Sequence, residues 1–241
     1  MSAAPWSGAL AIGVGWAALD ARLGKNTAHA HLAHQAILGL DGAVVVTTNS
    51  EIVAPTGKAI HIPTGQTHSI GPEGRLTRSI YIGPRCSGSR NDQQCNQPAC
   101  LSDDLSAALE HISDISQARD WAKRFAGRLP GSAIDSRLQK ALGNVRALAN
   151  PAALARELAL SPTRLREIVK ADFGVPPSNL LQWLQLLGAA KAMEASSSLA
   201  DAAAAGGFAD QAHFTRRLQQ WFGVTPKIGL SGLEVSVDDL S

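Results

Sequence analysis

Histidines cluster in the first third of the chain, where five of the seven lie in the segments HAHLAHQ and IHIPTGQTH. Residues two apart on a β-strand share a face, so His29, His31 and Gln35 can point together while His34 points away. His68 would then reach the same place from another strand. Three neutral imidazoles and an amide oxygen can hold a divalent ion such as Fe, Mn, Ni, Co or Zn. The alternative is that these side chains are hydrogen-bonded members of a ligand pocket.

Two later segments, SPTRLREIVK and DQAHFTRRLQQ, carry a second kind of chemistry. As helices, the first buries Leu165, Ile168 and Val169 and the second buries Phe214 and Leu218, which leaves polar and basic side chains outward. Arg, Gln and Thr side chains read base edges or hold phosphates in protein–DNA complexes. The alternative is an ordinary helical bundle with solvated basic side chains. The candidate DNA-contacting residues are Thr163, Arg164, Arg166 and Lys170 in the first segment and Gln211, His213, Thr215 and Arg216 in the second.

The three cysteines, Cys86, Cys95 and Cys100, lie close together in a polar part of the sequence. Three thiolates can bind a soft metal ion or respond to oxidants if their pKa values are lowered. Their spacing matches no zinc pattern, which favours free thiols in a loop. An odd number of neighbouring cysteines does not suit a secreted disulfide framework, so we expect a reducing cytoplasm.

The elements that must position these residues divide the chain into a β-rich half and a helical half. Residues 9 to 85 contain short runs rich in Val, Ile and Thr, separated by turn sequences such as DG, PTG and GPEG. From Ser102 onward, apolar residues recur every three or four positions, as in amphipathic helices. The sequence therefore predicts an α+β protein. Its expected parts are a β-barrel domain at 1–100, a helical connector at 101–149, an all-α domain at 150–229 and a C-terminal tail at 230–241.

Two apolar stripes in the helical connector are candidates for a subunit interface, because a narrow apolar stripe prefers a partner helix. The alternative is that they pack entirely on their own barrel. The stripes are Leu105, Leu109 and Ile112, and Ile134, Leu138, Leu142 and Val145.

The all-α domain contains a duplicated unit. With an offset of 49 residues, SPTRLREIVKADFGVPP aligns with DQAHFTRRLQQWFGVTP. Ser161 before Pro162 is a helix N-cap signal, and Asp210 can cap the second copy in the same way. Ala155 and Ala203 provide small side chains where two helices cross through a short turn. Each copy is therefore expected to be a helix-turn-helix unit, whose second helix can enter the major groove of DNA.

The motif GFADQAHF followed by FGVTP makes this domain resemble the AraC/XylS family of transcriptional regulators. The resemblance covers about residues 150 to 227 and implies two helix-turn-helix units joined by a long helix, here PPSNLLQWLQLLGAAKAMEAS. It also implies two recognition helices that face successive major grooves of double-stranded DNA. The connecting helix of the family usually carries an Arg-Leu pair where Leu186 and Leu187 stand in this chain.

The histidine segments are similar to the two cupin motifs. The resemblance implies a small β-barrel with three histidines converging inside it, and the fourth ligand, normally Glu in cupins, is Gln35 here. AraC-type sensors resemble cupins in general and often bind an organic effector in the barrel without a metal. The residues that fit the motifs are Gly24, His29, His31, Gln35 and Gly42 in the first and Gly57, Pro63, Gly65 and His68 in the second.

Charge alone identifies no partner. The 241-residue chain has a net charge of +2, and residues 150 to 227 hold 8 Lys and Arg against 6 Asp and Glu, so the argument for DNA depends on the motif. The apolar N-terminus lacks a basic n-region and is too short to span a bilayer, so we expect neither a signal peptide nor a membrane partner.

Together these patterns predict a cytoplasmic transcriptional regulator that binds double-stranded DNA as a homodimer. It is expected to respond to a small-molecule or metal effector in the barrel and to contact RNA polymerase if it is an activator. We expect no catalytic residues. One rival function is a metal-dependent cupin enzyme, an oxygenase or isomerase, with attached helices. The other is a helical adaptor without DNA affinity.

Overall fold

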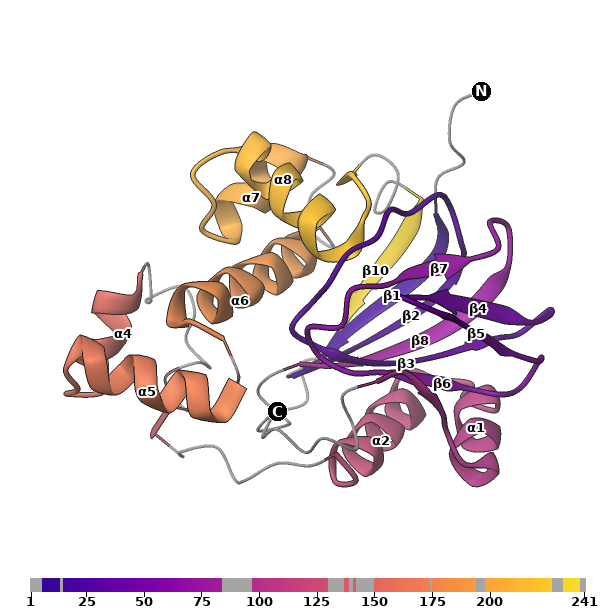
Figure 1. Ribbon diagram of the computed structural model, residues 1–241. Coiled ribbons are helices and arrows are strands. Elements are labelled where there is room, and N and C mark those ends of the chain that lie inside the picture. The colour runs from indigo at the N-terminus through magenta and orange to yellow at the C-terminus, as the bar shows by residue number, and fades with distance from the viewer. Residues whose placement is uncertain are drawn as a thin grey trace.

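The computed structural model contains a sheet-rich domain with helices on two sides of it (Figure 1). Helices α4 to α8 form one group beside the sheets, while α1 and α2 lie together on another side. This arrangement confirms the predicted α+β class, with a barrel-like domain followed by helices. The structure describes residues 6–13, 15–83, 97–129, 137–138, 141, 150–173, 175–193, 198–226 and 232–238.

Two β-sheets enclose the core of the N-terminal domain. Within the described residues, the large sheet has seven strands in the order β10-β1-β2-β8-β3-β6-β9, and the small sheet has three in the order β5-β4-β7. The large sheet contains β1 (Ser7–Gly13), β2 (Trp16–Arg22), β3 (His34–Gly39), β6 (Ile60–Ile62), β8 (Leu76–Ile82), β9 (Ala99–Cys100) and β10 (Leu233–Val237), and the small sheet contains β4 (Val44–Thr47), β5 (Glu51–Ala54) and β7 (Ser69–Gly71).

Strand β3 lies between β8 and β6 in the large sheet and is buried along its whole length. Successive side chains of a strand point to opposite faces, so β3 must satisfy two different environments. Ile37 belongs to the inner core between the sheets, whereas Leu38 packs in a second core on the outer face. Gln35 pairs in register with Tyr81 of β8, which places both side chains on the inner face.

Helices α1 (Asp103–Glu110) and α2 (Ile115–Ala126) cover the outer face of the large sheet. Asp114 caps α2, since its Oδ1 accepts a 2.9 Å hydrogen bond from the backbone N–H of Gln117. Leu105 and Leu109 are buried in the outer core. These two residues of the first apolar stripe therefore pack on their own barrel, which was the alternative to a subunit interface.

The second stripe is described only at Leu138, which is buried in the inner core. The other residues of that stripe, Ile134, Leu142 and Val145, lie outside the described residues, as do Cys86 and Cys95. Cys100 is exposed on β9 and its thiol is free.

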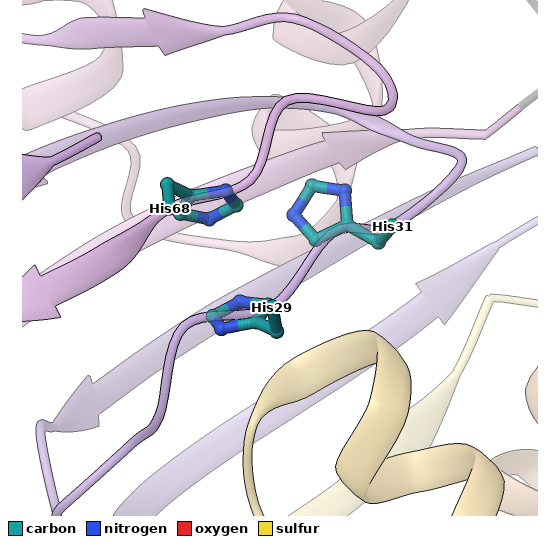
Figure 2. Close-up of side chains that lie close together, drawn as sticks. All are labelled: His29, His31 and His68. Atoms are coloured by element: carbon teal, nitrogen blue, oxygen red, sulfur yellow. The ribbon is translucent and has the colours of Figure 1, made fainter. Parts of the chain in front are cut away.

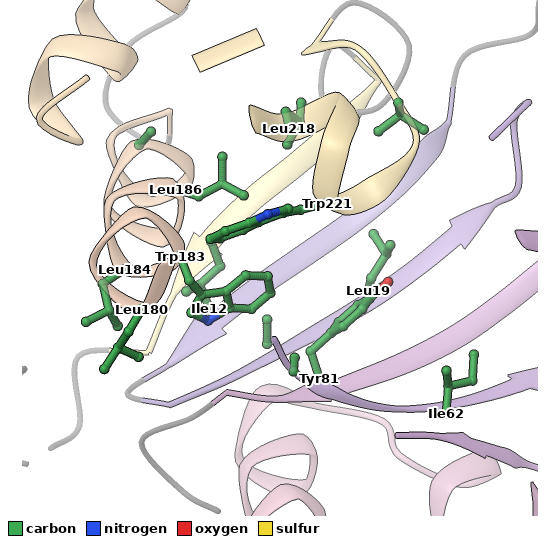
Figure 3. Packing of buried hydrophobic residues seen from close by; sticks show 14 of the residues in the cluster. Ile12, Leu19, Ile62, Tyr81, Leu180, Trp183, Leu184, Leu186, Leu218 and Trp221 are labelled. Atoms are coloured by element: carbon green, nitrogen blue, oxygen red, sulfur yellow. The ribbon is translucent and has the colours of Figure 1, made fainter. Parts of the chain in front are cut away.

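The C-terminal helices assemble around α6, which packs against α4, α5, α7 and α8. Trp183 of α6 lies with its ring centroid 5.2 Å from that of Trp221 in α8, and both rings are part of the inner core (Figure 3). The core of the barrel therefore continues into the helical domain. No described helix is long and apolar enough to cross a membrane. The helices are α4 (Pro151–Glu157), α5 (Pro162–Phe173), α6 (Pro177–Ala192), α7 (Leu199–Ala205) and α8 (Gln211–Phe222).

Strand β10 returns the end of the chain to the barrel. It pairs in parallel with β1, with Gly8 opposite Leu233, inside the segment expected to be a tail at 230–241. Asp238 follows this strand and is buried beside Arg119 of α2, with an Nη1–Oδ1 distance of 3.3 Å. In the sequence, helices α4 to α8 therefore lie between β9 and β10, which are both strands of the large sheet.

Candidate functional site

Three histidine side chains converge inside the barrel (Figure 2). One ring nitrogen from each of His29, His31 and His68 lies within 4.8 Å of the other two. His29 and His68 are held opposite each other by a pair of backbone hydrogen bonds, each 2.9 Å long. The backbone carbonyl of His31 accepts a 2.9 Å hydrogen bond from the N–H of Gly65, which fixes the third member.

Backbone carbonyl groups set the tautomer of all three rings. The Nδ1 atoms of His29, His31 and His68 lie 2.8 Å from the carbonyl oxygens of Thr27, Ala33 and Gln66, respectively. A neutral ring that donates from Nδ1 keeps its lone pair on Nε2. Metal-binding histidines are commonly oriented by a hydrogen bond of this kind from the ring nitrogen that does not bind the metal. Three Nε2 lone pairs are therefore available for one cation.

Gln35 completes the group that the sequence predicts. Its Oε1 lies 3.2 Å from His31 Nε2, while its amide nitrogen donates to Ser79 Oγ at 3.1 Å and to Tyr81 OH at 3.2 Å. In this orientation two lone pairs face each other between Gln35 and His31. Either a cation lies between them, or the amide turns and donates its N–H to the ring.

Burial keeps the three rings neutral. Loss of solvent is the main reason that the pKa of His29 falls to about 4, with a smaller contribution from nearby His68. The pKa of His31 is lowered well below its ordinary value, and that of His68 is lowered as well, again chiefly by burial. A metal ion binds only the neutral ring. The donor set of three imidazoles and an amide oxygen thus fits a divalent transition metal ion, and the described cluster contains no carboxylate.

Each helix-turn-helix unit has the predicted caps. Ser161 Oγ accepts a 3.2 Å hydrogen bond from the N–H of Arg164, and Asp210 Oδ1 accepts one of 2.6 Å from the N–H of His213. These bonds satisfy N–H groups that have no partner within the first turn of a helix. The two second helices, α5 and α8, therefore begin at equivalent positions of the repeat.

The turn of each unit contains a residue in the left-handed conformation. In the first, Ala159 has a φ of +53°, and in the second Gly207 has a φ of +81°. Gly206 lies so close to α6 that a Cβ there would be 2.6 Å from the carbonyl oxygen of Gln185. Ala155 and Ala203 are buried at the helix crossings, as their small size predicts.

Comparison with known proteins identifies this part of the chain. Residues 154–228 match a family model described as a helix-turn-helix domain. They form an AraC-type helix-turn-helix domain. No curated protein gives a significant match to the chain.

The AraC-type domain and the barrel together have the fold of ToxT from Vibrio cholerae. The crystal structure of ToxT from strain O395 superposes with a TM-score of 0.59 at 13% identity, covering 88% of this chain and 96% of that one. The unsaturated fatty acid-bound ToxT from strain SCE256 gives 0.55 at 14% identity, covering 88% and 92%. At these identities the likeness establishes the two-domain fold.

The predicted DNA-contacting side chains differ in how accessible they are. All four on α5 are exposed, as are Gln211 and Arg216 on α8. His213 and Thr215 are half-buried, and the His213 ring centroid lies 5.3 Å from that of Phe208. Arg164 forms a 3.0 Å ion pair with Glu167 on the same helix.

Sequence reasoning missed a cavity between the barrel and the AraC-type domain. Its volume is about 90 Å³, and it is lined by residues of β1, β2, β7, β8, β10, α6 and α8, together with Trp6, His29 and Val224. Such residues carry no individual signal, because an apolar side chain that lines a cavity looks like any core residue. The cavity becomes visible only when the helices are placed against the sheet.

A second buried histidine pair also escaped the sequence analysis. His34 Nδ1 lies 3.1 Å from His61 Nε2 on the outer face of the sheet, and the His61 ring packs edge-on against Phe125 of α2. Burial lowers the pKa of His34 to about 4. Burial and the neighbouring His34 lower the pKa of His61 to about 3. Because His34 is an odd number of residues from His29, His31 and Gln35, the alternation of side chains along a strand predicts that it faces away from them.

Proposed function

We propose that this protein is a sequence-specific DNA-binding transcriptional regulator of the AraC/XylS type, controlled by an effector in its N-terminal barrel. One observation carries the proposal: α5 and α8, the capped second helices of the two helix-turn-helix units, lie within the matched residues 154–228 and carry exposed basic side chains. In such units the second helix enters the major groove and meets base edges near its N-terminus.

The DNA-binding surface consists of the exposed faces of α5 and α8, with α6 holding the two units together. Arg166 and Arg216 are the leading candidates for base contacts, since both are exposed and have no ion-pair partner among the described residues. The ion pair of Arg164 with Glu167 is exposed, and pairs of this kind contribute only about 0 to 1 kcal/mol, so a phosphate can displace Glu167. Thr163, Lys170, Gln211, His213 and Thr215 complete the surface.

The effector site includes His29, His31 and His68, with Gln35 beside them. We assign it a divalent transition metal ion bound by the three Nε2 atoms. Support comes from the three Nδ1 atoms, each of which faces a backbone carbonyl at 2.8 Å. The ion would supply positive charge to a described cluster that consists of neutral imidazoles.

The remaining assignments follow from the resemblance to AraC-type regulators. The effector domain spans 1–100, the connector 101–149 and the DNA-binding domain 150–229. The protein works in the cytoplasm as a homodimer, and it contacts RNA polymerase if it is an activator. The enzyme alternative is not favoured, because no carboxylate belongs to the described histidine cluster to act as a general acid or base.

Selection of binding sites from random duplex DNA by the full chain tests the proposal. Enrichment of a defined sequence, bound in competition with a scrambled duplex at fixed salt, is the expected result. Binding that depends on salt alone, without any enriched sequence, would contradict a sequence-specific regulator.

A further inference from the structure

Glu167 and Arg216 occupy equivalent positions of the two helix-turn-helix units. Each lies six residues after the residue that caps its helix, Ser161 for α5 and Asp210 for α8. The residues four and eight positions after each cap are buried, namely Leu165 and Val169 in α5 and Phe214 and Leu218 in α8. The two helices therefore turn the same face toward the domain core. Glu167 and Arg216 are both exposed and lie at the same place on the opposite, DNA-facing side.

The two units carry different charges on this side. α5 has the carboxylate of Glu167 where α8 has the guanidinium of Arg216. The preceding residue differs as well, since Arg166 of α5 is equivalent to Thr215 of α8. A shift of one residue rotates a side chain by about 100° around a helix, so the arginines of the two units do not meet DNA in the same way. The two units therefore read different base sequences.

A carboxylate that faces DNA needs a hydrogen-bond donor. Phosphate oxygens repel it, and so do the acceptor atoms that guanine and thymine present in the major groove. Adenine presents a donor beside the acceptor N7, a pattern that suits the amide of Asn or Gln. Cytosine presents its N4 amino group as a donor, and Glu accepts a hydrogen bond from it. Of the four bases, cytosine is thus the best partner for Glu167.

Arg164 is the partner of Glu167 in the protein without DNA. The Arg164 Nη1 atom lies 3.0 Å from Glu167 Oε2, and the two side chains are 61% and 59% exposed. Exposed ion pairs of this kind are weak, so Arg164 can turn to a phosphate when DNA binds. Glu167 then needs a new donor, and a base edge supplies it.

From these observations we propose that Glu167 determines sequence specificity by accepting a hydrogen bond from the N4 amino group of a cytosine in the half-site bound by α5. Arg216, its equivalent in α8, donates to O6 and N7 of a guanine in the other half-site. This inference rests on the proposed DNA-binding function and adds what distinguishes the two half-sites. The DNA site is consequently not a repeat of one sequence.

Selection of binding sites from random duplex DNA by the full-length wild type and by Glu167→Gln tests the inference. Gln pairs with N6 and N7 of adenine, so the variant should select adenine where the wild type selects cytosine, with the other half-site unchanged. Competition anisotropy with duplexes that differ only at this base pair should show that each protein prefers its own base by about tenfold or more. Selection of the same cytosine by both proteins would overturn the inference.

Two further variants control for charge and for position. Glu157→Gln removes the same charge from the same unit, but Glu157 is exposed on α4 and not on a recognition helix. It should select the wild-type sequence. Arg216→Gln should change a base in the other half-site only. Loss of the cytosine in Glu157→Gln, or a change at the same base pair in Glu167→Gln and Arg216→Gln, would overturn the inference.

Arg164→Ala separates base recognition from the ion pair. This variant should bind all duplexes more weakly by a similar factor, with a smaller dependence on salt, and keep the preference for cytosine. A change of the preferred base in Arg164→Ala would assign the recognition to Arg164 and overturn the role of Glu167.

The wild-type selection separates the two proposals. A wild type that enriches no defined sequence refutes the proposed function, and the inference falls with it. A wild type that enriches a defined sequence which Glu167→Gln also enriches refutes only the role of Glu167.

Discussion

The backbone N–H of Thr27 donates a 3.1 Å hydrogen bond to the carbonyl oxygen of Gly223, which joins the barrel to the C-terminal end of α8. The Thr27 hydroxyl donates to the same oxygen at 3.3 Å. His29 lies two residues beyond Thr27, and its Nδ1 would be 2.8 Å from a Cβ at position 223. The segment that carries His29 is therefore hydrogen-bonded, through Thr27, to the residue that ends the second recognition helix.

Substitution of Gly223 by alanine should break this contact. Gly223 has a φ of +66°, and a Cβ there would be 2.3 Å from the carbonyl oxygen of Thr27. The left-handed conformation costs a residue with a Cβ about 1–2 kcal/mol, and the clash adds to that cost. We expect a lower free energy of unfolding in urea and the loss of any effect of zinc on DNA affinity.

Gly207→Ala is the matched control for that change. Gly207 has a similar φ of +81°, but its nearest neighbour is the side chain of Gln185 at 3.5 Å, with no barrel atom close by. The free energy of unfolding of this variant should fall only by the cost of placing alanine in the left-handed conformation. Its DNA binding should still respond to zinc. Equal behaviour of the two variants would show that contact with Thr27 does not couple the domains.

Arginine substitutions on the recognition helices test the DNA-binding surface. Arg166→Ala on α5 and Arg216→Ala on α8 should each weaken specific binding by roughly 1 to 3 kcal/mol if the side chain contacts a base. Arg128→Ala is the control, since Arg128 is also partly exposed but lies outside the AraC-type domain. Fluorescence anisotropy with the selected duplex at fixed salt measures all three, and wild-type affinity in both recognition-helix variants would exclude these contacts.

Removal of two histidines tests the metal site separately from DNA binding. The double variant His29→Ala/His68→Ala should bind no zinc yet retain DNA affinity, because neither histidine belongs to the exposed faces of α5 and α8 that carry the candidate DNA contacts. His111→Ala is the control, as His111 is exposed at the end of α1 and away from the cluster. Elemental analysis after dialysis gives the zinc content, and full occupancy in the double variant would refute the assigned ligands.

The His34–His61 pair predicts acid sensitivity of the fold. The pKa of His61 is about 3 in the folded protein and 6.5 in its ordinary state, so the unfolded chain binds more protons between these values. The neutral His61 ring therefore costs no stability above pH 6.5. As the pH falls from 6.5 toward 3, the free energy of unfolding decreases by about 1.4 kcal/mol per pH unit for this one histidine.

Urea unfolding of the wild type and His61→Gln at a series of pH values measures this contribution. The variant should show a shallower decline in unfolding free energy between pH 6.5 and pH 4.5, whereas His111→Gln should follow the wild type. A variant whose stability falls as steeply as that of the wild type would mean that His61 is protonated in the folded protein.

Local signals in the sequence predict the helical units well. The caps Ser161 and Asp210 act within one helical turn, and the repeat places both units at the correct positions. The sequence also predicts that the histidines converge, but it does so by assuming that His29 and His31 lie on a regular strand. His29 and His31 lie outside the regular strands, and His29 meets His68 through an isolated bridge instead of a continuous ladder.

Contacts between residues far apart in the chain could not be predicted in this way. Thr27 and Gly223 are separated by 196 positions, and no local pattern marks one as the partner of the other. Strand β10 is short and gains its partner only because the chain returns to β1. The cavity likewise depends on how the helical domain packs against the sheet, which is a tertiary property.

The dissociation constant of the full chain for its selected duplex, measured against a scrambled duplex at the same salt concentration, tests whether the protein is a metal-responsive, sequence-specific regulator. We expect a preference of about 10³-fold or more for the selected sequence. Zinc should change the affinity of the wild type for that sequence but leave the His29→Ala/His68→Ala variant unaffected. Equal affinity for the two duplexes, with and without zinc, would contradict a metal-responsive, sequence-specific regulator.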